Sequence, residues 1–195
     1  MITEQSRQDD ELGQRFFYGE GKRKSYKRAF PLLLKAAQAG HVHCQNLVGY
    51  SYDSGLGVET DKRLAVFWYA KAAEADHPIA LCNLAISYAA GTGVKKDRQK
   101  AFTFCQRAAE LGDVWAQCNL GAMFLDGEGV EQDLEQGIKW TRNAASKGDS
   151  LAQYNLGMAY LEGNGLRRDL NRAKIWLTKA AHQGHRKARK TLQGL

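Results

Sequence analysis

The chain has 195 residues, of which 44% are hydrophobic and 25% are charged, and its formal net charge at pH 7 is +7. This composition is typical of a soluble globular chain and argues against intrinsic disorder. No stretch approaches the roughly 20 consecutive apolar residues that a membrane-spanning helix needs, so no membrane segment is expected. The first ten residues are polar and acidic, unlike a signal peptide, and a cytoplasmic location is therefore expected.

A pattern recurs along the chain every 36 residues, and the length equals five such periods plus 15 residues. Each copy has a leucine or valine followed by glycine or alanine, then an aromatic residue, then a Gly-x-Gly pair. The copies begin at Leu12, Val48, Leu84, Leu120 and Leu156. An Ala-Ala pair closes each copy, and no insertion or deletion interrupts the register. Five copies in register indicate a repeat protein.

Each repeat is predicted to form two helices joined by a turn. The repeats are expected at residues 6–41, 42–77, 78–113, 114–149 and 150–185. In the first half of a repeat, residues spaced by four, such as Ala80, Leu84 and Tyr88, lie on one face of a helix. In the second half, Ala65 and Trp68 begin a similar stripe. The Gly-x-Gly pair ends the first helix because glycine accepts the left-handed conformation.

Polar residues at fixed positions are expected to cap these helices. An aspartate follows the glycines in four repeats and is expected to cap the second helix. These aspartates are Asp61, Asp97, Asp133 and Asp169. His41, His77 and His185 share one position just after a second helix, where we expect capping rather than metal binding. Pro31 falls inside the second helix of the first repeat and is expected to kink or delay it.

Two further features concern packing and the end of the array. Glycine recurs inside the first helix, where it costs roughly 1 kcal/mol relative to alanine, so another helix is expected to approach closely there through an aromatic side chain. These glycines are Gly13, Gly49, Gly121 and Gly157. Ala188 and Leu192 continue the first-helix stripe, so residues 186–194 are predicted to form a single capping helix with a polar outer surface.

The repeated residues resemble the Sel1-like repeat, a relative of the tetratricopeptide repeat. The matching pattern is Ala-x-x-x-Leu-Gly-x-x-Tyr-x-x-Gly-x-Gly-Val-x-x-Asp, followed by Ala-x-x-Trp-x-x-x-Ala-Ala-x-x-Gly, and residues 42–76 and 150–184 carry it most fully. The resemblance implies an all-α fold: a right-handed superhelical α-solenoid of five 36-residue helix-turn-helix repeats plus a C-terminal capping helix, in a single domain over residues 1–195. It also implies a bacterial protein-interaction scaffold whose concave groove is lined by first helices.

Asparagines precede the core leucine in three consecutive repeats, at Asn83, Asn119 and Asn155. This position lies roughly 100° around the helix from the core stripe, so the side chains are expected to face the groove or a neighbouring helix. An amide offers both a donor and an acceptor, which suits binding of an extended peptide. The same chemistry also suits a buried amide that satisfies loop backbone, and the sequence leaves both interpretations open.

Other positions near these asparagines are candidates for the same surface. Ser87 and Met123 follow one helical turn after Asn83 and Asn119. Trp115 precedes Asn119 by one turn and is the best candidate anchor, because large aromatic residues dominate many interfaces. The alternative is that Trp115 packs beneath the turn between two repeats.

The residue types that carry catalysis or metal binding show no convincing pattern. The cysteines, Cys44, Cys82, Cys105 and Cys118, lack zinc-type spacing and occupy apolar or small positions of the repeat. This favours free buried thiols over disulfides between helices. No Ser/His/Asp, Cys/His or paired-carboxylate set is evident, and the Gly-x-Gly pairs follow helices rather than strands, against a dinucleotide site. We expect no cofactor, no metal and no enzymatic activity.

Charge is distributed unevenly along the repeats. Residues 161–195 contain nine basic and two acidic residues, whereas seven acidic residues and no basic one lie between Arg107 and Lys139. Such banding favours steered binding to a charged partner, although a solvated surface explains it equally.

The expected function is that of an adaptor that binds a protein or peptide, and neither nucleic acid nor a small molecule is favoured. One alternative is an immunity protein that neutralises a toxin. Another is a hydrolase or penicillin-binding activity, which is less favoured because the four cysteines do not all share one repeat position. No pattern specifies an oligomeric state.

Overall fold

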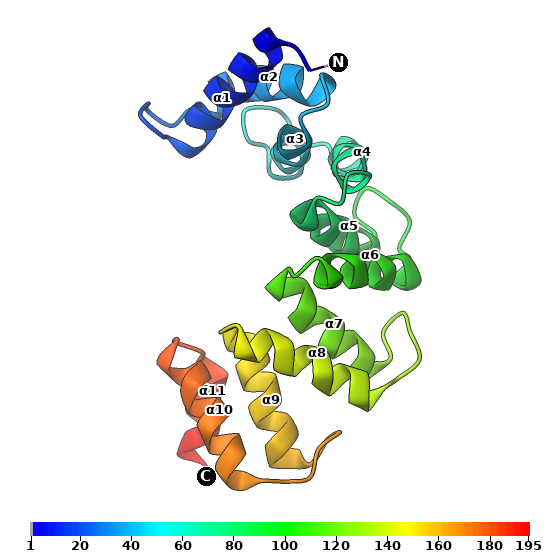
Figure 1. The fold of residues 1–195 in the computed structure, drawn as a ribbon, viewed down its shortest axis with the longest axis vertical. Helices are drawn as coiled ribbons and strands as arrows, with labels where there is room; N and C mark the ends of the chain where they lie inside the picture. Colours follow the sequence, from blue (N-terminus) through cyan, green and yellow to red (C-terminus); the bar gives the residue numbers. More distant parts are fainter. Residues whose placement is uncertain (1) are drawn as a thin grey trace. The chain divides into compact units, whose positions relative to one another are not determined.

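The computed structural model describes residues 2–195, and every regular element within that range is an α-helix. Two compact units divide the chain, one ending at Asp97 and the other running from Arg98 to Leu195 (Figure 1). The first unit contains α1 (Glu4–Tyr18), α2 (Tyr26–Gln38), α3 (Val42–Ser54), α4 (Lys62–Ala73) and α5 (Pro78–Ala90). The second contains α6 (Arg98–Glu110), α7 (Val114–Asp126), α8 (Leu134–Ser146), α9 (Ser150–Glu162), α10 (Leu170–His182) and α11 (Arg186–Gln193).

Within each unit, every helix packs against the helices that precede and follow it in the chain (Figure 1). The core lies between these successive helices. Leu33 and Val48 are fully buried in the first unit, and Leu156 and Leu177 are fully buried in the second. Because each helix packs mainly against its neighbours in sequence, the arrangement is that of an α-solenoid. The predicted all-α solenoid fold is confirmed.

The helix ends follow the predicted capping scheme. The first glycine of each Gly-x-Gly pair takes a left-handed conformation at the end of a first helix, for example Gly55 with φ of 71°. The side chain of Asp61 accepts hydrogen bonds from the backbone N–H groups of Arg63 and Leu64, and the side chain of Asp133 accepts one from Gln136. These bonds satisfy donors that a helix start leaves free, so Asp61 and Asp133 set where α4 and α8 begin.

The glycine inside the first helix is explained by close packing. At Gly49, an added Cβ would lie 2.6 Å from the Tyr69 ring and 3.1 Å from the carbonyl oxygen of Ala65, so α3 and α4 could not approach as they do. The predicted close approach is confirmed. The expectation of an aromatic partner holds only at Gly49, because Leu33 and Leu177 occupy that place beside Gly13 and Gly157.

The second glycine of the Gly-x-Gly pair lets successive repeats stack. A Cβ at Gly57 would overlap the carbonyl of Tyr26, at the first turn of α2 in the preceding repeat. The same overlap would occur between Gly93 and the carbonyl of Lys62 in α4. The turn of one repeat therefore rests on the backbone of the previous second helix, and a side chain there would push the two apart.

Two predictions concern the ends of the array. Helix α2 begins at Tyr26 and continues through Pro31, so the expectation that the proline delays the helix is wrong. The lost N–H leaves the carbonyl of exposed Lys27 without its helical donor, where water can replace it. At the other end, α11 buries Ala188 completely and packs Leu192 against the core, as predicted for a capping helix.

Candidate partner-binding face and neighbouring polar clusters

Large apolar side chains are exposed at one repeat position on three consecutive first helices. Ile79 on α5 is 52% exposed, and Trp115 on α7 and Leu151 on α9 are each 44% exposed. Each lies one residue before a fully buried alanine, so one helical turn contributes an exposed side chain and a core side chain. Exposed apolar residues that recur at one position mark a surface suited to binding another protein.

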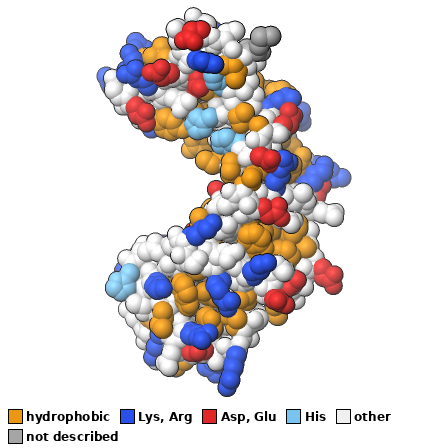
Figure 2. All heavy atoms as spheres, viewed as in Figure 1, with side chains coloured by type: hydrophobic (Ala, Val, Ile, Leu, Met, Phe, Trp, Pro, Cys, Tyr) orange, Lys and Arg blue, Asp and Glu red, His pale blue; other side chains and the backbone are white. Residues whose placement is uncertain are grey.

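The first-helix face of each unit is the side of its own first helices that carries these residues. On α5 it includes Ile79, Asn83 and Ile86, which follow one another at spacings of four and three and so share one side of the helix. On α7 and α9 the corresponding members are Trp115 with Asn119 and Leu151 with Asn155. Figure 2 shows hydrophobic side chains reaching the surface among polar ones in both units.

In the first unit, Asn83 lies at a hollow of about 220 Å³. The hollow is lined by Asp53, Lys62, Tyr69, Asn83, Ile86, Ser87 and Thr92. The amide nitrogen of Asn83 donates a hydrogen bond of 3.2 Å to the side-chain oxygen of buried Asn46 on α3. Asn46 was missed from sequence because it aligns with Cys82, not with Asn83. The Ser87 hydroxyl donates to the carbonyl of Asn83 at 2.8 Å, which leaves it poorly placed to donate to a partner.

In the second unit, the two predicted asparagines have different surroundings. The amide nitrogen of Asn119 donates to the carbonyl of Trp115 at 2.7 Å, one turn earlier on α7. Asn155 is half-buried on α9, and Met123 is half-buried on α7. The Trp115 side chain projects from α7 with nearly half its surface exposed, so it is accessible to a partner. Of the predicted site residues, Trp115 is therefore the most accessible large group.

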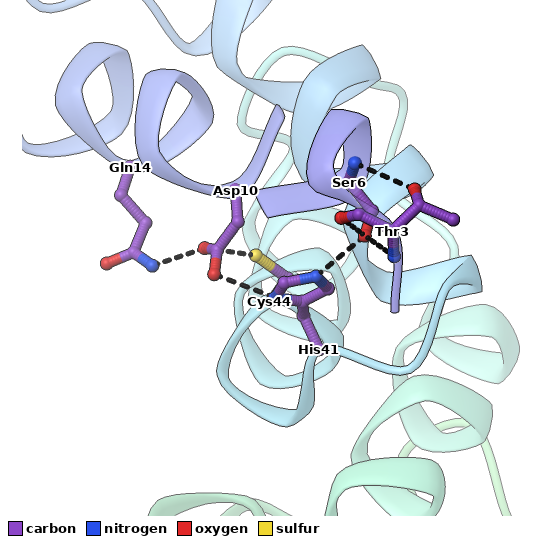
Figure 3. Close-up of polar contacts among 6 residues, drawn as sticks. All are labelled: Thr3, Ser6, Asp10, Gln14, His41 and Cys44. Atoms are coloured by element: carbon purple, nitrogen blue, oxygen red, sulfur yellow. Dashed lines mark hydrogen bonds and ion pairs between the residues drawn. The ribbon is translucent and has the colours of Figure 1, made fainter. Parts of the chain in front are cut away.

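A polar cluster in the first unit joins α1 to the start of α3 (Figure 3). The Nε2 atom of His41 lies 3.0 Å from the hydroxyl oxygen of Ser6, and its Nδ1 atom lies 2.9 Å from a carboxylate oxygen of Asp10. The thiol of Cys44 donates to the other Asp10 oxygen at 3.0 Å. Burial opposes ionisation of Asp10, but hydrogen bonds from Cys44, Gln14 and His41 outweigh it and lower the pKa of this carboxyl.

The contacts run from Ser6 through His41 to Asp10, as they do in the catalytic triad of a serine hydrolase. This constellation was not predicted from the sequence. Here, however, Ser6 is buried, and its hydroxyl donates to the carbonyl of Thr3 at 2.8 Å and accepts from the Thr3 N–H at 2.9 Å. The N–H of Ser6 is also occupied, because it donates to the Thr3 hydroxyl. The hydroxyl therefore caps α1, and the cluster fastens that helix to α3.

The histidine positions follow the capping prediction in two of three cases. The Nδ1 atoms of His77 and His185 accept hydrogen bonds from the backbone N–H groups of Ala80 and Ala188. His41 occupies the same position without a side-chain cap, because its ring bonds Ser6 and Asp10 instead. Within residues 2–195, no group of three His, Cys, Asp or Glu side chains is arranged to hold a metal ion.

All four cysteines are free and buried, as predicted, and the alternative of disulfides between helices is wrong. Burial raises the pKa of Cys105 to about 12, with a smaller contribution from Asp113. Burial likewise raises the pKa of Cys118 to about 12, with contributions from Asp149 and Cys105. Thiols of this kind are poor nucleophiles at neutral pH, since the thiolate is the reactive form.

Comparison with known proteins agrees with the fold. Sel1 repeats match residues 11–41, 42–77, 78–113, 116–149 and 150–185, so the chain belongs to the Sel1 repeat family. Sel1 repeat proteins are generally protein-interaction scaffolds. No protein of curated function matches the chain. Within residues 2–195, none of the helices combines the length and the apolar character required to cross a bilayer.

Several solved structures share this architecture. A protective antigen of uropathogenic Escherichia coli with an SLR fold is 33% identical, with a TM-score of 0.90, and the match covers 96% of this chain. The chain spans only 40% of the length of that protein. A Sel1 repeat protein of Oxalobacter formigenes is 32% identical over 97% of this chain and 75% of its own, with a TM-score of 0.89. An immunity protein of Pseudomonas aeruginosa is 23% identical over 96% of this chain and 69% of its own, with a TM-score of 0.57, which shows a shared fold.

Proposed function

We propose that this protein is a non-enzymatic adaptor that binds a protein or peptide partner through its first-helix face. The observation that carries the proposal is the exposure of Ile79, Trp115 and Leu151 at the same repeat position. Apolar side chains held on rigid helices lose little conformational freedom on binding, so they suit an interface. Asn83, Asn119 and Asn155 lie one turn further along the same helices and would supply polar contacts beside these anchors.

Two further parts of the proposal concern chemistry and location. The hydroxyl of Ser6 is engaged as a helix cap, which supports a structural role for the cluster that resembles a hydrolase triad. Four buried free thiols are typical of a reducing compartment and support a cytoplasmic location. Covalent labelling of Ser6 by a β-lactam or by an organophosphate would contradict the non-enzymatic part of this proposal.

The test is a pull-down with the intact chain and a matched pair of variants. In the first variant, Trp115 and Leu151 are changed to alanine on the first-helix face. In the control, Phe67 on α4 and Ile175 on α10 are changed to alanine; these side chains are equally exposed but lie on second helices. We expect the first variant to lose partners that the wild type and the control retain. Equal retention by both variants, with helicity unchanged, would contradict the proposal.

The asparagines are tested separately. A chain with Asn83, Asn119 and Asn155 all changed to alanine is expected to bind the same partner at least about tenfold more weakly, since each amide would lose a hydrogen bond worth roughly 1 kcal/mol. Unchanged affinity in a folded variant would assign these amides to helix packing alone.

A second candidate is an immunity protein that neutralises a toxin. The banded charge of the chain suits a charged toxin, and the fold is shared with an immunity protein of Pseudomonas aeruginosa. The experiment is co-expression with the product of a neighbouring toxin-like gene. Rescue of growth by the wild type, and not by the Trp115 and Leu151 variant, would support this candidate and the first-helix face together.

A further inference from the structure

A hollow in the second unit is lined by arginines. It has a volume of about 570 Å³ and is bounded by Arg142, Tyr160, Leu166, Arg167, Arg168, Asp169 and Arg172. The arginines come from α8, from the turn before α10 and from the first turn of α10. Figure 2 shows Lys and Arg side chains standing among hydrophobic ones over this unit. The hollow shares no lining residue with the first-helix face.

Charge in this hollow is strongly unbalanced. The only carboxylate in its lining belongs to Asp169, which is paired with Arg172 at 3.4 Å and also caps α10. Four guanidinium groups less one carboxylate leave a net charge of +3 in the lining. The lining therefore holds no second carboxylate that could neutralise Arg142, Arg167 and Arg168. This excess of positive charge suits an anionic ligand.

Tyr160 lines the hollow and is itself held by arginine. The Nη1 atom of Arg172 donates to the phenol oxygen at 3.4 Å, and the guanidinium lies 5.6 Å from the ring centroid. Burial favours the neutral phenol, but hydrogen bonds from Arg172 and Arg142 outweigh it and lower the pKa of Tyr160.

The repeat does not require these arginines. At the two positions of Arg167 and Arg168, the fourth repeat has Glu131 and Gln132, and the second repeat has Glu59 and Thr60. The first and third repeats have basic pairs there, Arg23 with Lys24 and Lys95 with Lys96, but neither is a pair of arginines. The fold is the same in all of them, so the arginine pair has no general role in stacking the repeats. Its presence beside two further arginines is specific to the fifth repeat.

We propose that this arginine hollow binds an acidic peptide segment that carries at least two neighbouring carboxylates. Guanidinium groups pair with carboxylates through two parallel N–H···O bonds, and several such groups can hold successive acidic side chains. The volume lies in the range of sites that enclose a ligand of many atoms, and a single phosphate or carboxylate would fill only a small part of it. The inference goes beyond the adaptor role and does not depend on the first-helix face.

The experiment measures the binding of a fluorescein-labelled hexaglutamate peptide by fluorescence anisotropy. Wild type is compared with an Arg167→Gln, Arg168→Gln variant and with a control carrying Arg186→Gln and Arg189→Gln on α11. Both variants lose two positive charges from exposed positions near the C-terminus, and only the first changes the hollow. We expect the first to bind at least about tenfold more weakly and the control to stay within about twofold of wild type.

Three outcomes would overturn the proposal: no binding of hexaglutamate by the wild type, equal weakening in both charge variants, or displacement of the peptide by inorganic phosphate at concentrations where acetate has no effect. The last would identify a phosphate site. The Trp115→Ala variant keeps the hollow intact and is expected to bind hexaglutamate normally. Failure of the first-helix face and failure of the arginine hollow are therefore distinguishable.

Discussion

The two units are built from the same repeat, but different polar side chains link successive repeats in each of them. In the first unit, Ser6 and Asp10 on α1 contact His41 at the start of α3, and His43 on α3 contacts His77 at the start of α5. In the second unit, the amide nitrogen of Gln183 contacts the carbonyl of Gly148 at 2.8 Å and the side chain of Gln153 at 2.9 Å. The repeated residues thus specify how the helices pack. The hydrogen bonds between repeats come from residues that differ from one repeat to the next.

These links differ in their response to pH. His43 lies with its Nδ1 atom 3.4 Å from the Nε2 atom of His77, and its own Nε2 atom lies 3.2 Å from the Tyr18 hydroxyl. Because His77 accepts a backbone N–H at Nδ1, its Nε2 carries the hydrogen that points to His43. Protonating His77 would place a hydrogen on Nδ1, against the backbone N–H of Ala80 that this atom now accepts. Amide links such as those of Gln183 do not titrate.

The largest expected effect tests whether the hydrophobic cores of the two units are equally stable, although their polar contacts differ. Leu33 and Leu177 occupy matching positions, are fully buried and rest against the glycine of the adjacent first helix. Changing either to alanine is expected to lower the free energy of unfolding by about 2–5 kcal/mol, since each change removes core contacts and leaves a cavity. Urea denaturation of the two variants measures this, and a loss in only one of them would show that the cores are not equivalent.

A smaller effect tests the cluster that fastens α1. His41→Ala removes the ring that joins Ser6 and Asp10. This change is expected to lower the free energy of unfolding by about 1–2 kcal/mol, because the two polar side chains lose their hydrogen-bond partner. The control is His182→Ala, an exposed histidine at the end of α10, which is expected to change stability by less than about 0.5 kcal/mol. Amide hydrogen exchange should show faster opening of α1 in the first variant. Equal stability of the two variants would show that the cluster does not stabilise the fold.

The smallest expected effect is a pH dependence confined to the first unit. Burial, with the neighbouring His43, lowers the pKa of His77 below its ordinary value of 6.5. A histidine whose pKa is lowered by folding contributes stability above pH 6.5, and this contribution is lost as pH falls through the lowered value. We therefore expect exchange from α3 and α5 to accelerate, relative to α9, between about pH 7 and 5. Uniform acceleration in both units, or none, would contradict this.

Much of the fold could be predicted because the repeat encodes it locally. Asp133 caps α8 and Gly55 ends α3 through contacts within a few residues, so position in the repeat was sufficient to place them. The partner of the helix glycine was only partly predictable. Gly49 meets Tyr69, whereas Gly157 meets Leu177, since the opposing side chain varies between repeats.

The polar sites were harder to predict because their members lie in different repeats. Ser6 and His41 are 35 residues apart in the chain, and nothing near either of them indicates the other. The basic C-terminal region was evident from composition, but composition does not show that Arg142 on α8 faces Arg167 across one hollow. Single-domain behaviour over residues 1–195 and the roles of the three asparagines stay predictions.

The sequence by itself determined the number of repeats, the capping of their helices, the burial of the cysteines and the family. It did so because helix periodicity, glycine turns and aspartate caps act over a few residues and recur every 36 positions. Only the tertiary structure decided that Trp115 is exposed, that Ser6 is engaged as a cap and that four arginines line one hollow together with Tyr160. Exposure and the pairing of distant side chains depend on how successive repeats stack, which no local pattern specifies.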